Sequence, residues 1–121
     1  MRNEELELDA LWRHAVKVGA GFCCEKCGVY LFERQLQAHH IFKRFKHSVR
    51  WLKENGACLC HKCHVWAEAH QKECIEWFRS KRGEIWFYNL ELESRKILDS
   101  LTDDIVLNFK LALVEVINET R

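Results

Sequence analysis

The chain has 121 residues and a net charge of +1, a length that suits one compact domain. Apolar residues make up 48% of it, so a hydrophobic core is expected and the composition argues against general disorder. No apolar run approaches the roughly 18 residues that span a membrane, and the acidic N-terminus lacks a signal-peptide pattern, so we expect a cytoplasmic protein with no membrane partner.

The first predicted element is an amphipathic helix within residues 4–18, which the glycines Gly19 and Gly21 end. Acidic residues lead in this segment and basic residues follow, as the helix dipole favours. We therefore assign residues 1–21 to an N-terminal helix. Its apolar positions recur at helical spacing and are Leu8, Leu11, Trp12, Ala15 and Val16.

Two cysteine pairs with the same spacing follow: Cys24 with Cys27, and Cys60 with Cys63. The odd total of seven cysteines and the expected intracellular setting argue against a disulfide framework. Zinc prefers four tetrahedral thiolate ligands, so the two pairs predict one closed structural zinc site. Cys23 competes with Cys24 as a ligand, and we prefer Cys24 because its spacing matches that of the second pair.

The segment around and between the pairs predicts three short strands and a helix. The first pair is expected to feed a strand at "GVYLF", and "LQAHHIF" and "ACLC" are predicted strands. A basic connection over residues 43–57 ends in Asn55-Gly56, a turn signal. A helix is expected to begin near His64, and residues 22–70 are assigned to the zinc-bound core.

Helices are predicted for the remaining residues, 71–121, with a break at Gly83 and with Thr102 as the N-cap of the last helix. The stretch "EIWFYNLELESRKIL" fits a strand or a helix, and we favour a helix because no partner strand is apparent. The wide apolar face of the last helix is expected to pack on the core, with a homodimer interface as the alternative. Cys58 and Cys74 are interpreted as small buried apolar residues.

Positive charge is concentrated in residues 34–53, which hold six lysines and arginines and no acidic residue. Because this run surrounds a pair of histidines, it favours a phosphate-bearing partner over an ordinary solvated face. Trp51 is expected in the core. The candidate phosphate contacts are Arg34, Lys43, Arg44, Lys46 and Arg50.

Three histidines and an asparagine lie between and just after the cysteine pairs: His39, His40, Asn55 and His64. Two imidazoles on different elements can grip a divalent ion, and another can take a proton from water near neutral pH. Neighbouring side chains on a strand point to opposite faces. We expect this alternation to relax at the end of the strand, so that the rings of His39 and His40 can both contact one phosphate.

The pattern "AHHI" followed by "NGACLCHKCH" resembles the HNH nuclease family, over residues 22–66. The double histidine is similar to the colicin nuclease domains, and a looser similarity to phage recombination proteins of the NinG/Rap type extends to "RSKRGEIWFYNLE". The resemblance implies an α+β fold with a small ββα-metal (treble-clef) core stapled by the zinc, flanked by the N-terminal and C-terminal helices.

The resemblance also implies a part for each site residue. His39 and His64 would bind a catalytic divalent metal (Mg²⁺, Mn²⁺, Ni²⁺ or Zn²⁺), His40 would activate the attacking water, and Asn55 would orient His40. Glu68 stands where some members of the family carry another histidine, so it is either a further ligand or a solvated helix residue.

The expected function is that of a metal-dependent DNA endonuclease that leaves 5′-phosphate and 3′-hydroxyl ends on duplex or branched DNA. A phage origin, with action in the host cell, is part of this expectation. The alternative is a non-catalytic zinc-dependent module that binds branched DNA in phage recombination. No secretion or receptor-binding segment supports a third interpretation, a toxin-like nuclease domain. No protein partner can be inferred.

Overall fold

The structure, a computed structural model, describes residues 3–43, 47–98 and 100–119 of the chain. Within these ranges the protein is α+β, mostly helical around a two-stranded antiparallel sheet, which confirms the expected class at this level. Two of the expected phosphate contacts, Arg44 and Lys46, lie outside the described residues.

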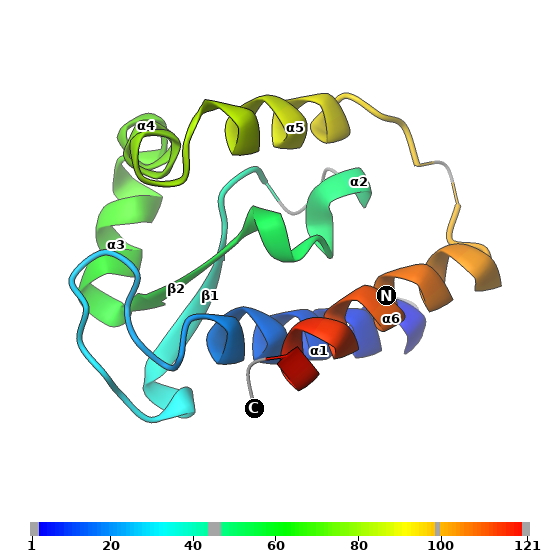
Figure 1. Cartoon of the computed structure of the whole chain (residues 1–121), viewed down its shortest axis with the longest axis horizontal. Coiled ribbons are helices and arrows are strands. Elements are labelled where there is room, and N and C mark those ends of the chain that lie inside the picture. Colours follow the sequence, from blue (N-terminus) through cyan, green and yellow to red (C-terminus); the bar gives the residue numbers. More distant parts are fainter. Residues whose placement is uncertain (1–2, 44–46, 99, 120–121) are drawn as a thin grey trace.

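The sheet lies at the centre of the molecule, with helices on both of its faces (Figure 1). Strand β1 (Leu36–His40) pairs with β2 (Gly56–Cys60), and His40 lies opposite Gly56 in the register. Helix α3 (His61–Ala69) follows β2 directly. Because both faces of the sheet are covered, every residue of β2 is buried.

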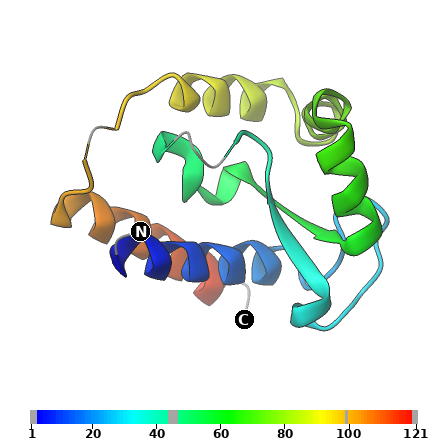
Figure 2. The same ribbon diagram turned by 180° about the vertical axis from the view of Figure 1, so that it is seen from behind.

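The predicted N-terminal helix is confirmed as α1 (Asn3–Gly19), and α6 (Asp103–Glu119) lies beside it and runs in the same direction (Figures 1 and 2). Apolar residues of the two helices and of one sheet face form a first core, and this burial is what stabilises their pairing. Its buried members include Leu8, Trp12, Val16, Cys58, Leu113 and Ile117.

The last helix therefore packs back on the chain, with α1 as its main partner. The hydroxyl of Thr102 accepts a hydrogen bond from the amide of Ile105 at 3.3 Å, so the predicted N-cap is present. The opposite side of α6 leaves Leu107 and Leu111 exposed, and the homodimer remains a prediction.

A second core lies on the other face of the sheet, where α3 and α4 (Gln71–Arg82) cover it. Its buried members include Ile41, Ala57, Leu59, Ala67, Cys74 and Phe78. After Gly83, whose φ of 100° suits a glycine, the ambiguous stretch forms helix α5 (Glu84–Ser94), as favoured. In the described part of the chain, no helix has the length and apolarity that crossing a membrane requires.

Several predicted boundaries are wrong. Among the described residues, the strand expected after the first cysteine pair is only a bridge between Cys23 and Tyr30. The connection between the strands contains helix α2 (His47–Arg50) and a 3₁₀ turn, η2 (Lys53–Asn55). Another 3₁₀ turn, η1 (Glu33–Gln35), precedes β1, and α3 begins three residues before the predicted start.

Gly56 is needed for close packing and does not form the predicted turn. Its φ of −104° is extended, and it begins β2 where that strand crosses α1. A Cβ at this position would collide with Cγ2 of Val16 and lie 3.0 Å from Cζ2 of Trp12. The absence of a side chain therefore lets α1 approach the sheet.

We expect Gly56→Ala to lower the free energy of unfolding by about 1–3 kcal/mol, because overpacking forces the helix and the strand apart. Urea denaturation followed by circular dichroism measures this change. Gly19→Ala is the matched control, since its Cβ would meet only the flexible end of Lys53 at 3.0 Å and Val116 at 3.4 Å. A Gly56→Ala protein as stable as this control would contradict the expectation.

Candidate metal centres

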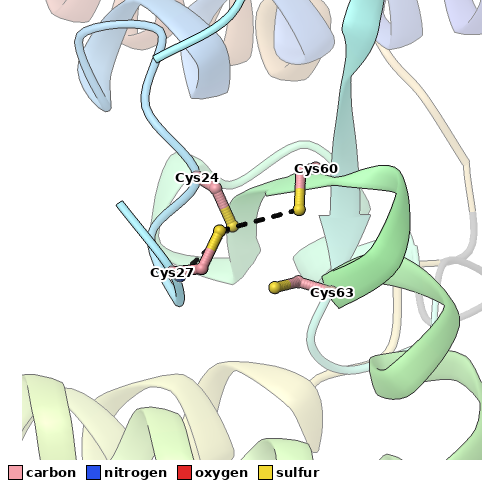
Figure 3. A group of neighbouring side chains, drawn as sticks. All are labelled: Cys24, Cys27, Cys60 and Cys63. Atoms are coloured by element: carbon pink, nitrogen blue, oxygen red, sulfur yellow. Dashed lines mark hydrogen bonds between the residues drawn. The ribbon is translucent and has the colours of Figure 1, made fainter. Parts of the chain in front are cut away.

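Four cysteine side chains converge beside the sheet (Figure 3). Cys24 and Cys27 come from the turn that follows α1, Cys60 ends β2 and Cys63 lies in the first turn of α3. Their Sγ atoms all lie within 4.8 Å of one another, and those of Cys27 and Cys60 are 3.8 Å apart. Zn–S bonds of about 2.3 Å in a tetrahedron place the sulfurs about 3.8 Å apart. The cluster could therefore hold a metal ion such as zinc.

Within the cluster the local backbone favours the thiolate of Cys24, whereas burial raises the pKa of Cys63. Gly28, with a φ of 82°, closes the turn by donating its amide to the carbonyl of Cys24 at 2.8 Å. Burial acts to raise the pKa of Cys24, but hydrogen bonds from the backbone of Cys27, Cys60 and Lys26 lower it to about 7, which favours the thiolate.

The other cysteines of this region lie outside the cluster. The thiol of Cys23 contacts the carbonyl oxygen of Gly21 at 3.5 Å, so the structure brings in Cys24, the residue that the spacing favoured. Cys58 is fully buried in the first core, and burial, followed by the charge of Glu25, raises its pKa to about 12. It is a neutral, apolar thiol, as interpreted.

A second group of ligand atoms lies between β1 and α3. His39 is on β1, while His64 and Glu68 are one helical turn apart on α3, and their ligand atoms lie within 4.8 Å of one another. Oε1 of Glu68 is 3.5 Å from Nδ1 of His39 and 3.3 Å from Nε2 of His64. His64 directly follows Cys63, so the first turn of α3 carries a residue of each group.

His39 shows why this second group suits a cation. Its ring is 6% exposed, and among the described residues no group hydrogen-bonds to its buried Nδ1. Burial lowers its pKa to about 4 against the attraction of Glu68, so the ring is neutral at pH 7. A neutral imidazole with an unsatisfied nitrogen facing a carboxylate fits a divalent ion with mixed nitrogen and oxygen ligands.

These ligands line an open cavity of about 260 Å³ at the end of the sheet. The exposed Lys43 and the neighbouring His40 line the same cavity. The full lining is Ala38, His39, His40, Ile41, Lys43, His64, Glu68 and Gln71. The cavity therefore gives an outside ligand access to both adjacent histidines.

The two adjacent histidines nevertheless point to opposite faces of the sheet. His39 lies against α3, with its ring centroid 5.3 Å from that of His64. The ring of His40 stacks on Trp12 of α1, with centroids 3.9 Å apart and planes 10° apart. The prediction that alternation relaxes at the strand end is therefore wrong, since both residues keep their pairing with β2. Both residues nevertheless line the cavity described above.

Asn55 is fully buried and holds the connection between the strands together. Its Oδ1 accepts the amide of Phe42 at 2.7 Å, and its Nδ2 donates to the carbonyls of Phe42 at 3.0 Å and Val49 at 3.2 Å. Asn55 makes none of these hydrogen bonds to His40, whose Nε2 lies 2.9 Å from the backbone carbonyl oxygen of Arg50. Any orienting effect of Asn55 on His40 is thus transmitted through this loop.

The expectation that Arg50 contacts phosphate is wrong. Its side chain is 5% exposed, and its guanidinium makes two hydrogen bonds to the carboxylate of Asp9, at 3.0 and 2.7 Å. Trp51 is in the core, as expected. Arg34 is exposed, but it lies on η1 before β1, near Phe32 and at the opposite end of the strand from the histidines. Lys43 remains the described cation that lines the cavity.

Sequence reasoning missed the residues that support the histidines from distant segments. In the sequence, Asp9 and Trp12 are ordinary residues of a predicted amphipathic helix, and no pattern links them to the histidines. Cys74 is buried as interpreted, but its Sγ also lies 3.8 Å from Nε2 of His39. Burial and then the charge of Glu68 raise the pKa of Cys74 to about 11, so it faces the ring as a neutral thiol.

The chain was compared with protein-family models, with curated proteins and with solved structures, and none of them matches it. What the protein does must therefore be inferred from its own residues.

Proposed function

We propose that this chain is a metal-dependent DNA endonuclease of the HNH type, acting on duplex or branched DNA. The observation that carries the proposal is the convergence of His39, His64 and Glu68 around a cavity that also reaches His40. The order β1, β2, α3 beside a four-cysteine cluster supports the proposal, because the resemblance to the HNH family implies two strands followed by a helix next to a zinc site.

His40 is suited to act as the general base. Its Nε2 lies 2.9 Å from the carbonyl oxygen of Arg50, and that oxygen can only accept a hydrogen bond. The neutral ring therefore carries its proton on Nε2 and its lone pair on Nδ1. In the proposed reaction Nδ1 takes the proton from the water that attacks the phosphorus atom.

His39, His64 and Glu68 would hold the catalytic ion. A divalent ion held there supplies positive charge beside the scissile phosphate and the departing 3′ oxygen. The carboxylate of Glu68 favours harder ions such as Mg²⁺ and Mn²⁺ over the ions that an all-histidine site selects. Lys43, exposed at the cavity, would attract the phosphate without reading the base sequence.

The four cysteines take a structural part in this proposal. Four thiolates complete a tetrahedral zinc site and leave no position open for substrate. Zinc bound there would tie the turn after α1 to the start of α3, and so fix His64 and Glu68 relative to β1.

The proposal is tested with a plasmid-nicking assay. Protein that retains its zinc is freed of other metals and supplied with Mg²⁺, Mn²⁺ or Ni²⁺. We expect conversion of supercoiled plasmid to nicked or linear DNA with 5′-phosphate and 3′-hydroxyl ends. His64→Ala should lose most of this activity because one of three ligands is gone.

His70→Ala is the matched control, because His70 is exposed and its Nδ1 contacts the carbonyl of Trp66 at 3.2 Å, outside the cavity. If the wild-type protein binds branched DNA but cuts no DNA with any of these metals, the endonuclease proposal is wrong. That outcome would favour the non-catalytic binding module.

A further inference from the structure

Helix α1 provides a flat surface for one face of the His40 ring. The indole of Trp12 lies parallel to the imidazole, with centroids 3.9 Å apart and planes 10° apart. The indole is itself fixed, because Trp12 is 1% exposed and its Nε1 donates to the carbonyl of Leu52 at 2.8 Å. The His40 ring therefore cannot tilt toward α1 without displacing a core residue.

The same helix also fixes the hydrogen-bond partner of His40. Asp9 accepts two hydrogen bonds from the guanidinium of Arg50 and a third from Nε1 of Trp51 at 2.8 Å. Asp9 and Arg50 are both buried, and a buried ion pair of this geometry resists separation. The pair thus anchors the residue whose backbone carbonyl lies 2.9 Å from Nε2 of His40.

We propose that Trp12 and Asp9 of α1 are positioning residues for the general base. Trp12 sets the plane of the His40 ring, and Asp9, through Arg50, holds the carbonyl that keeps the proton on Nε2. This inference rests on the proposed function, since it concerns the residue that takes the proton in that reaction. It makes the N-terminal helix part of the active site, although α1 precedes the segment that resembles the nuclease core.

Substitutions of Trp12 separate positioning from simple core packing. Trp12→Leu keeps an apolar side chain but removes the aromatic face, whereas Trp12→Phe keeps that face. At saturating metal and DNA, we expect Trp12→Leu to lower kcat by about 10- to 100-fold, because a small misplacement of a reacting group costs on this scale. Trp12→Phe should recover most of the loss.

Two further readouts do not depend on cleavage. Titration with Co²⁺, followed by its absorbance, should give the same affinity in Trp12→Leu as in the wild type, because His39, His64 and Glu68 are untouched. Nitrogen-15 NMR of the His40 ring should show the proton on Nε2 in the wild type. It should show a mixture of tautomers in Asp9→Asn, where the carbonyl is no longer held.

Leu113→Ala is the matched control. Leu113 is 2% exposed in the same core, on α6, so the variant loses core packing without changing the groups around His40. Circular dichroism checks that each variant is folded. If Asp9→Asn does not fold, the Trp12 variants alone test the positioning inference.

The positioning inference is overturned if Trp12→Leu and the control Leu113→Ala have the same kcat and the same tautomer of His40. The endonuclease proposal would still stand in that case. If the wild type cuts no DNA, the proposed function is wrong, and a changed tautomer in Asp9→Asn still supports the fixing of the His40 ring by α1.

Discussion

Cys60→Ser is expected to lose the structural metal and to unfold the protein. Cys60 joins β2 to α3, and its sulfur lies 3.8 Å from that of Cys27, which is 33 residues earlier in the chain. Structural zinc contributes about 10–16 kcal/mol in small zinc-dependent folds. Domains of this size are stable by only about 5–15 kcal/mol, so the second core should not survive without the ion.

The measurement is metal content by mass spectrometry, together with thermal unfolding followed by circular dichroism. Cys23→Ser is the matched control, since Cys23 is next to Cys24 in the chain but its thiol lies outside the cluster. The control should keep one zinc per chain and the wild-type midpoint. A Cys60→Ser protein that also keeps both would show that the ligand set is wrong.

His40→Ala is expected to fold, to bind DNA and the catalytic metal as the wild type does, and to lose cleavage by about 10²- to 10⁴-fold, the usual contribution of a general base. Affinity should persist because the metal ligands and Lys43 are unchanged. His40→Gln is the sharper variant, since an amide can still donate to the carbonyl of Arg50 but cannot take a proton from water at neutral pH.

Initial rates of plasmid nicking at saturating metal measure the loss, and fluorescence anisotropy with labelled DNA measures the affinity. If either variant cleaves DNA at the wild-type rate, the assignment of His40 as the general base is wrong. Equal loss of cleavage and of DNA affinity would instead assign His40 to binding.

The first and last helices and the cysteine cluster could be predicted because they depend on local patterns, whereas the group of His39, His64 and Glu68 was expected only through the resemblance. Apolar residues at helical spacing located α1 and α6, and the spacing of the two cysteine pairs indicated the cluster. His64 and Glu68 are one turn apart on a helix, so their shared face follows from the sequence alone.

The support of His40 could not be predicted, because it joins segments far apart in the chain. Arg50 and Asp9 are separated by 41 residues. A basic run does not reveal which of its members is buried in an ion pair, so the sequence predicts the same phosphate contact for Arg50 as for the other basic residues. The geometry of a strand implies that His39 and His40 point to opposite faces of the sheet. Which aromatic ring of α1 packs against His40 depends on how the helix crosses the sheet.

The pairing of α1 with α6 has a consequence for the order of folding. The ion pair between Glu7 and Lys110 joins residues 103 positions apart, and the apolar contacts of the two helices span similar distances. On the ribosome α1 emerges well before α6, so the apolar side of α1 that α6 covers stays uncovered until α6 has been made. Such long-range contacts slow folding and leave apolar surface open to aggregation. The turn that carries Cys24 and Cys27 and the start of α3 are all made earlier, so zinc binding can precede the closure of the first core.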